Sequence, residues 1–184
     1  MDNWGIYNYI KAKNGGGSEY RNALDSIIDR SITLISNDRV TSIGTYALFA
    51  CRNLTEANFP NVTSIGGNAF QGCSNLTEVN FPNVTNIGGN AFNNCVSLTT
   101  ADFISVTAIQ PRAFVGCTNL TTLVLRIEQV CALSNTDALS GTVISRGTGY
   151  IYVPDDLVED YKTATNWTVY EDQIKGLSQL PEGV

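Results

Sequence analysis

The sequence predicts a solenoid, mostly β or α/β, in which short parallel strands stack into a right-handed curved array with helical N- and C-terminal caps. The first observation behind this prediction is a 22-residue period: residues 40–44 recur as residues 62–66 and 84–88, and more loosely as residues 106–110. The second is that separate columns of residues keep the same spacing, which is the signature of a repeat architecture. The columns are Leu54, Leu76, Leu98 and Leu120; Phe59, Phe81, Phe103 and Leu125; and Cys51, Cys73, Cys95 and Cys117.

Each repeat contains a strand followed by a return path. In residues 76–81 the apolar side chains fall where a strand would turn inward, and Pro82 ends the strand. The apolar residues that follow, such as Ile87, belong to a return path that we expect on the convex side, bent at the glycines of residues 88–89. One coil cannot bury these side chains alone, but coils stacked about 4.8 Å apart place each column on itself. The sequence therefore predicts one strand per coil, in a parallel ladder over a continuous core.

We expect one structural domain made of three segments. Residues 1–31 form an N-terminal helical cap, in which residues 18–30 carry apolar side chains at helical spacing. Residues 32–125 form the leucine-containing repeats, beginning with a weaker strand at residues 32–35. Residues 126–184 form a degenerate repeat and a C-terminal cap, because a solenoid must cover the apolar face of its last coil.

The C-terminal segment has its own internal pattern. Residues 141–153 predict one or two degenerate strands. Asp155 and Asp156 mark the start of a helix that runs to about Lys162, since carboxylates are favourable in a first helical turn. We expect three further residues to pack beneath this helix, namely Trp167, Tyr170 and Ile174.

The composition excludes several classes of function. The formal net charge is −6, whereas nucleic-acid binders need lysine and arginine to displace counterions, so we expect no nucleic acid as a partner. No segment approaches the roughly 18 consecutive apolar residues of a membrane span, and the first residues lack the basic and apolar regions of a secretion signal. We therefore expect a chain that contacts no membrane and acts in the cytoplasm.

Side chains suited to catalysis or metal binding are few. The chain has no histidine, which is the commonest general base and zinc ligand near neutral pH. The cysteine column spaces its thiols in a line, so we expect buried thiols there and at Cys131, and no metal. Glu56 and Glu78 fall one coil apart, near the ~5 Å carboxylate separation of retaining glycosidases, but Thr100 and Thr122 continue their column without an acid. We predict no enzyme activity, no catalytic residue and no cofactor, and keep glycan hydrolysis as an alternative.

The outward side chains of the strands form the candidate partner-binding face. They make a polar and acidic surface of about five coils, and repeat proteins use such extended faces to bind partners. The face comprises Thr55, Glu56, Asn58, Thr77, Glu78, Asn80, Thr99, Thr100, Asp102, Thr121 and Thr122. The caps are the other place where a partner could bind, because they concentrate the aromatic residues Trp4, Tyr7, Tyr9, Trp167 and Tyr170.

Part of the repeat is similar to a known family. Residues 69–77 spell Ala-Phe-Gln-Gly-Cys-Ser-Asn-Leu-Thr and are followed by Phe81 and Pro82 and by the motif of residues 84–88. This pattern resembles the BspA-like class of bacterial leucine-rich repeats, over about residues 32–125, and residues 150–154 resemble the closing segment of such proteins. The resemblance implies the leucine-rich-repeat fold, and family members that are surface or interaction proteins rather than enzymes.

The function expected from these observations is a non-enzymatic protein–protein interaction module that presents a polar, acidic repeat surface to a host or phage protein. Short chains without a leader resemble family members encoded by phages and prophages of gut bacteria, so a phage-associated location stands beside the cytoplasmic one. Besides the glycan-acting enzyme, two alternatives stay open: a phage-encoded inhibitor of an intracellular host protein, and a cell-surface adhesin. The sequence names neither the protein partner nor the oligomeric state.

Overall fold

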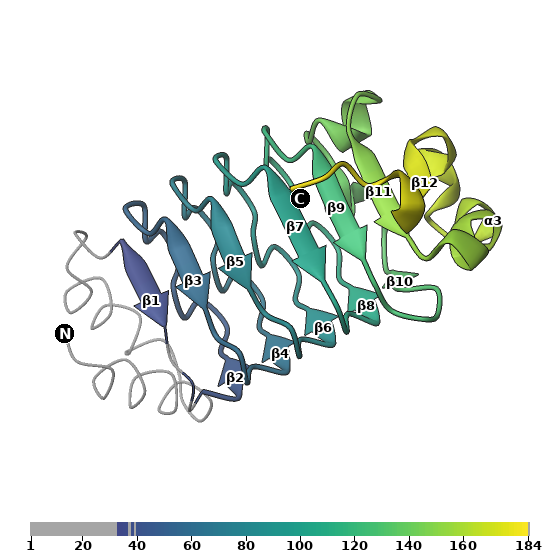
Figure 1. Cartoon of the computed structure of the whole chain (residues 1–184). Helices are drawn as coiled ribbons and strands as arrows, with labels where there is room; N and C mark the ends of the chain where they lie inside the picture. Colours follow the sequence, from purple (N-terminus) through teal and green to yellow (C-terminus); the bar gives the residue numbers. More distant parts are fainter. Residues whose placement is uncertain (1–32, 37, 39, 184) are drawn as a thin grey trace.

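The chain folds as a solenoid whose coils each cross two ladders of parallel strands (Figure 1). The computed structural model describes residues 33–36, 38 and 40–183, so the predicted N-terminal cap of residues 1–31 lies outside the described residues. The long-strand ladder comprises β1 (Leu34–Ser36), β3 (Glu56–Asn58), β5 (Glu78–Asn80), β7 (Thr100–Phe103), β9 (Thr122–Leu125), β11 (Tyr150–Val153) and β12 (Ile174–Gly176). The short-strand ladder comprises β2 (Ser42–Ile43), β4 (Ser64–Ile65), β6 (Asn86–Ile87), β8 (Ala108–Ile109) and β10 (Ala132–Leu133).

The return path of each coil forms a strand of its own, where the sequence predicted only one strand per coil. Its register is constant, since Ile43 pairs with Ile65 and Ile65 pairs with Ile87. The same spacing continues beyond the strand, where the backbone N–H of Gly66 donates to the carbonyl of Ile43 at 2.8 Å. A buried backbone donor without a partner is costly, and a constant repeat places each donor beside an acceptor of the next coil. The prediction of one strand was wrong because it considered side-chain periodicity alone.

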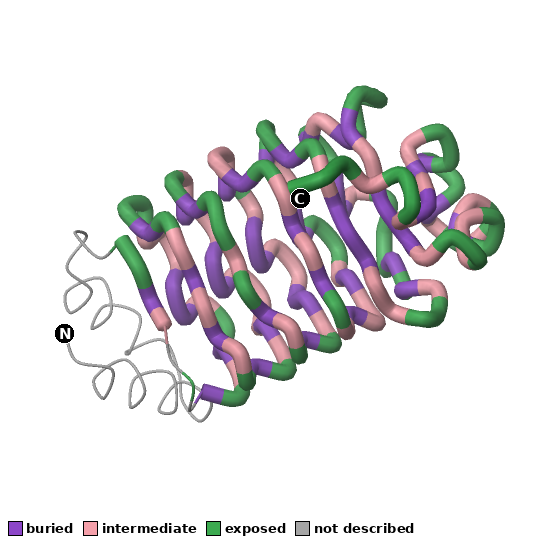
Figure 2. Tube along the Cα trace, in the orientation of Figure 1, coloured by how far each residue is buried: buried purple, intermediate pink, exposed green. Residues whose placement is uncertain are grey.

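The core lies between the two ladders and is built from the predicted columns (Figure 2). All four leucines of the column from Leu54 to Leu120 are fully buried. The phenylalanines of the return path stack on one another: the ring centroids of Phe70 and Phe92 lie 5.2 Å apart, and those of Phe92 and Phe114 lie 5.3 Å apart. Aromatic contacts of this kind contribute beyond the area that they bury. The stack therefore ties each coil to the next.

The long-strand ladder is interrupted between β5 and β7. Strands β1, β3 and β5 form one sheet and β7, β9, β11 and β12 form another, with no strand pairing between the two sheets. Val79 of β5 is only partly buried, whereas Ala57 and Ala101 at the same position of the neighbouring coils are fully buried. The short-strand ladder runs unbroken past this point. The coils thus stay stacked while the long-strand face divides into two parts.

Residues 141–153 contain one strand, β11, which is the smaller of the two predicted numbers. The residues before β11 instead form the 3-10 turn η2 (Ile144–Arg146), which follows η1 (Thr136–Leu139). The buried hydroxyl of Thr142 donates to the carbonyl of Leu139 at 2.7 Å and accepts the N–H of Ser145 at 3.0 Å. Such local side-chain bonds compete with strand formation, which explains the turn.

The rest of the C-terminal cap packs around two buried aromatic residues. The predicted helix start at Asp155 is confirmed, because η3 (Asp155–Leu157) leads into α3 (Val158–Thr163). The indole nitrogen of Trp167 donates to the backbone carbonyl of Cys131 at 2.6 Å, and the hydroxyl of Tyr170 donates to the backbone carbonyl of Thr136 at 2.6 Å. Ile174 is buried as predicted, but in the unpredicted strand β12. The remaining elements are η4 (Thr168–Gln173) and η5 (Leu177–Gln179).

The burial of these aromatic residues bears on the suggestion that a partner binds the caps. Trp167 is fully buried and Tyr170 keeps only 4% of its surface exposed. Both side chains therefore hold the cap together and cannot meet a partner. The other three aromatic residues of that suggestion, Trp4, Tyr7 and Tyr9, lie outside the described residues.

Candidate partner-binding site

The predicted face lies on the outer side of the long-strand ladder, here called the long-strand face. Its residues belong to both sheets: Thr55, Glu56, Asn58, Thr77, Glu78 and Asn80 to the coils of β3 and β5, and Thr99, Thr100, Asp102, Thr121 and Thr122 to the coils of β7 and β9. In the first sheet Glu56 pairs with Glu78 and Asn58 pairs with Asn80. The structure thus brings the predicted columns together, but in two parts separated by the interruption after β5.

The threonine column joins coils and is already hydrogen-bonded. The hydroxyls of Thr55, Thr77 and Thr121 each donate to the carbonyl of the residue one coil earlier, at 2.7, 3.1 and 3.1 Å. Two asparagine side chains also join neighbouring coils, because the side-chain amide of Asn80 donates to the side-chain oxygen of Asn58 at 3.1 Å. These groups stabilise the stacking of coils, and they leave the glutamates as the distinctive chemistry of the first sheet.

Glu56 and Glu78 are direct neighbours in the register of β3 and β5. Glu56 is half-buried and Glu78 is exposed, and neither has an ion-pair partner among the residues that the structure describes. Like charges on adjacent strands destabilise a sheet. Within the part of the chain that the structure describes, the pair is therefore a negative site without a counter-charge, and a cation bound there would relieve the repulsion.

The acidic character of the face ends at β7. The carboxylate of Asp102 accepts three hydrogen bonds from the guanidinium of Arg126, one from Nη2 at 2.6 Å and two from Nε at 2.9 and 3.1 Å. This hydrogen-bonded pairing raises the pKa of Arg126. Asp102 is thus neutralised within the chain, so it contributes less to a negative potential than its place in the sequence suggests.

Three residues of the same face were missed by the sequence prediction. In the register Tyr150 pairs with Thr122, Tyr152 pairs with Val124, and Lys175 pairs with Tyr152. The ammonium of Lys175 lies 3.5 Å from the ring centroid of Tyr150, within range of a cation–π interaction. The alternation of residues 150–153 was the available signal, because it places both tyrosines on one side of a strand.

The cysteine column is buried inside the coils, away from this face. The thiols of Cys73, Cys95 and Cys117 donate to carbonyls of the preceding coil at 3.1, 3.2 and 3.0 Å. Burial raises the pKa of Cys117 and of Cys131 to about 12. The prediction of buried thiols is confirmed for Cys73, Cys95, Cys117 and Cys131, whereas Cys51 at the start of the column is only half-buried. Within residues 33–36, 38 and 40–183, no three acidic, cysteine or histidine side chains are grouped so that they could hold a metal ion.

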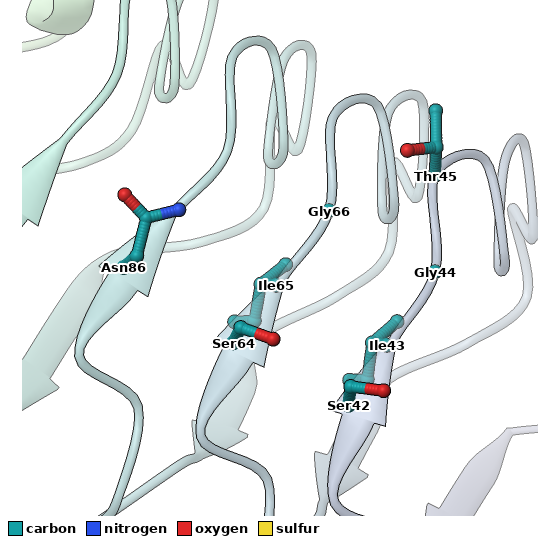
Figure 3. A pocket seen from close by; sticks show the side chains of 8 residues that line it. All are labelled: Ser42, Ile43, Gly44, Thr45, Ser64, Ile65, Gly66 and Asn86. Carbon is teal, nitrogen blue, oxygen red and sulfur yellow. The ribbon is translucent and has the colours of Figure 1, made fainter. Parts of the chain in front are cut away.

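A shallow hollow lies on the other ladder (Figure 3). It is lined by Ser42, Ile43, Gly44, Thr45, Ser64, Ile65, Gly66 and Asn86. The polar groups in this lining are hydroxyls and one amide, so it contains no acid, base or thiol for catalysis. The long-strand face is therefore the candidate site that the geometry favours. No helix in the described part of the chain is both long and apolar enough to cross a bilayer.

The comparisons with known proteins identify the repeat. The family described as BspA type leucine rich repeat region matches residues 29–148, in six copies. No curated protein gives a significant match. The matched region covers most of the described repeats and continues past Leu125 into the turns that precede β11.

Solved bacterial leucine-rich repeat proteins share the fold. A leucine rich cell surface protein from Faecalibacterium prausnitzii is 22% identical, with 77% of this chain and 35% of that chain covered and a TM-score of 0.59. A leucine rich repeat protein of T. pallidum is 25% identical, and the match covers 67% of this chain and 56% of that chain with a TM-score of 0.53. A leucine-rich repeat protein from Bacteroides ovatus is 28% identical, and the match covers 78% of this chain and 34% of that chain with a TM-score of 0.56. The chain spans less than two thirds of the length of each.

Proposed function

Since this chain belongs to the family of BspA-type leucine-rich repeat proteins, we propose that it is a non-enzymatic protein-interaction module whose acidic long-strand face binds a basic segment of a partner protein. The observation that carries the proposal is the stacked pair of Glu56 and Glu78, which has no ion-pair partner among the described residues. Asp102 on the same face is paired with Arg126 and provides the contrast.

Electrostatics gives the pair its role. A lysine or arginine placed between two carboxylates of adjacent strands would interact with both and remove their mutual repulsion. Complementary charge of this kind raises the association rate and selects the partner more than it raises affinity. The interaction should therefore weaken as salt is added.

The geometry also argues against the glycan-hydrolysis alternative. Catalytic carboxylates act in a concave pocket that changes their protonation and excludes water. Glu56 and Glu78 stand on the outer side of a sheet, and the hollow with the lining named above lies on the other ladder. A protein surface is the ligand class that fits an extended, open face of this kind.

The test compares two charge-reversal variants in capture experiments from host-cell lysate. Glu56→Lys with Glu78→Lys changes the proposed site, and Glu128→Lys with Glu171→Lys makes the same change in net charge at two exposed glutamates elsewhere. We expect a protein that the native chain and the control variant retain at low salt, that is lost with the Glu56/Glu78 variant, and that is released as salt rises. A partner retained equally by both variants would contradict the proposal.

The place of action is a separate part of the proposal. We place the module in the cytoplasm of the producing or infected cell, or in association with a phage particle. Fractionation of expressing cells distinguishes the alternatives: recovery in a cytosolic or virion fraction agrees with the module or with an inhibitor of a host protein. Recovery at the cell surface would support the adhesin instead.

A further inference from the structure

One row of the long-strand face changes from exposed to buried along the solenoid. Asn80, Asp102, Val124, Tyr152 and Lys175 occupy the corresponding position of successive strands. Asn80 is exposed and Asp102 half-buried, whereas Val124 has no exposed surface and Tyr152 keeps only 4%. Neither Val124 nor Tyr152 belongs to the core between the ladders. Neighbours within a sheet shield a side chain only from the sides, so these two are covered from above.

The C-terminal segment supplies the cover. In the view of Figure 1 the chain after β12 turns back, passes in front of β11 and β9 and ends near β7, and η5 contacts β11. Leu177 and Leu180 are half-buried, while Ser178, Gln179 and Pro181 between and after them are exposed. Residues three apart in a 3-10 turn lie on the same side. The two leucines therefore face the sheet.

A polar clasp holds the start of this segment. The carboxylate of Asp155 accepts the hydroxyl of Ser178 at 2.5 Å and the backbone N–H of Ser178 at 3.2 Å. The carboxylate also lies against Gly176, where any side chain would collide with it. Hydrogen bonds to an ionised group are among the stronger ones in proteins. The clasp thus sets the direction in which residues 177–183 leave β12.

We propose that residues 177–183 form a strap over an aromatic interaction surface made of Val124, Tyr150, Tyr152 and Lys175. In the free chain the strap occupies this surface through Leu177 and Leu180. The partner chemistry that fits it is a segment that carries two leucines three residues apart in a 3-10 turn, as the strap does, and that replaces the strap when the clasp opens. The surface lies next to the acidic site and extends the proposed function, but its existence does not depend on Glu56 and Glu78.

Exposure of Tyr152 is the direct readout. Hydroxyl-radical footprinting with mass spectrometry compares the native chain, the full-length variant Asp155→Ala and a chain that ends at Gly176. In the native chain we expect Tyr152 to be oxidised as slowly as Tyr161, the fully buried residue of α3. In both variants oxidation of Tyr152 should rise several-fold while that of Tyr161 stays unchanged. Unchanged protection of Tyr152 in both variants would overturn the strap.

A second experiment tests whether the surface binds a leucine-containing segment. A synthetic peptide with the sequence of residues 177–183 is added at millimolar concentration to the shortened chain, with a control peptide in which both leucines are replaced by serine. Restored protection of Tyr152 by the first peptide alone supports the surface, and equal results with the two peptides overturn it. If the shortened chain loses protection at Tyr161, the peptides are compared on Asp155→Ala. Loss of lysate capture by the Glu56/Glu78 variant affects neither result.

Discussion

Replacing Gly66 and Gly67 by alanine tests the spacing of the coils at adjacent positions. A Cβ at Gly66 would lie 2.6 Å from the backbone nitrogen of Thr45 and 2.8 Å from the carbonyl carbon of Gly44, both in the preceding coil. A Cβ at Gly67 would meet its nearest atom, the carbonyl oxygen of Gly89, at 3.4 Å. Neither glycine has a positive φ, so neither substitution is opposed by a left-handed backbone, and we compare them by the space around the added Cβ.

The magnitude follows from what must move. Backbone atoms of the preceding coil cannot rotate away, so Gly66→Ala must separate the coils where Gly66 donates to Ile43 at 2.8 Å and where β2 pairs with β4. Weakening two of these hydrogen bonds costs about 1 kcal/mol each, and overpacking adds about 1–3 kcal/mol. We expect Gly66→Ala to lower the free energy of unfolding by about 3 kcal/mol. Gly67→Ala should leave it unchanged or raise it by up to about 1 kcal/mol, because alanine restricts the unfolded chain.

Urea denaturation followed by circular dichroism measures both variants against the native chain. The denaturation midpoint of Gly66→Ala should fall clearly, with that of Gly67→Ala at or above the native value. Equal midpoints for the two variants would refute the reasoning, because the coils would then not approach as closely as the structure shows. A fall for Gly67→Ala alone would refute it as well.

Three further predictions concern packing, charge and pH. Phe92→Ala should lower the free energy of unfolding by about 3–5 kcal/mol in urea denaturation, since Phe92 stacks on Phe70 and Phe114; Phe92→Leu should cost less, and equal losses would argue against the stack. Because Arg126 and Asp102 are about one third exposed, a double-mutant cycle with Arg126→Met and Asp102→Asn should give a coupling of about 1 kcal/mol or less, and a much larger value would contradict this. Burial raises the pKa of Cys117 and Cys131 from 9 to about 12. The folded chain therefore retains thiol protons that the unfolded chain loses. The urea concentration at the denaturation midpoint should decrease as the pH is raised from about 9 to about 12. A midpoint that stays constant over this range would contradict the prediction.

The repeat made much of the fold predictable. Each column of leucine, phenylalanine and cysteine found in the sequence lies in the core or against it, at the spacing of one coil. The short-strand ladder was missed because its strands are two residues long, too short for alternation to be recognised. What forms it is backbone hydrogen bonding between identical positions, a consequence of the constant period that side-chain patterns do not display.

The candidate site was only partly predictable, because its character depends on segments that are not repeated. Asp102 counted as an acid in the sequence, but Arg126, which lies one coil further on, neutralises it. The tyrosines of β11 fell in the predicted degenerate strands of residues 141–153 but were not counted in the binding face, although their strand continues the long-strand face. The predicted binding residues stay a proposal, whereas their positions on this face are observed.

The sequence by itself determined that this chain is a solenoid, because a 22-residue period in several apolar columns can bury its side chains only by stacking coil on coil. Only the tertiary structure decided which parts of the long-strand face are open. Asn80 and Val124 occupy equivalent positions, yet the first is exposed and the second is covered. The strap that we propose accounts for the difference, because the non-repetitive residues 177–183 pass over this part of the sheet and Ser178 is hydrogen-bonded to Asp155 where they leave β12. A contact between segments so unlike the repeat leaves no period in the sequence.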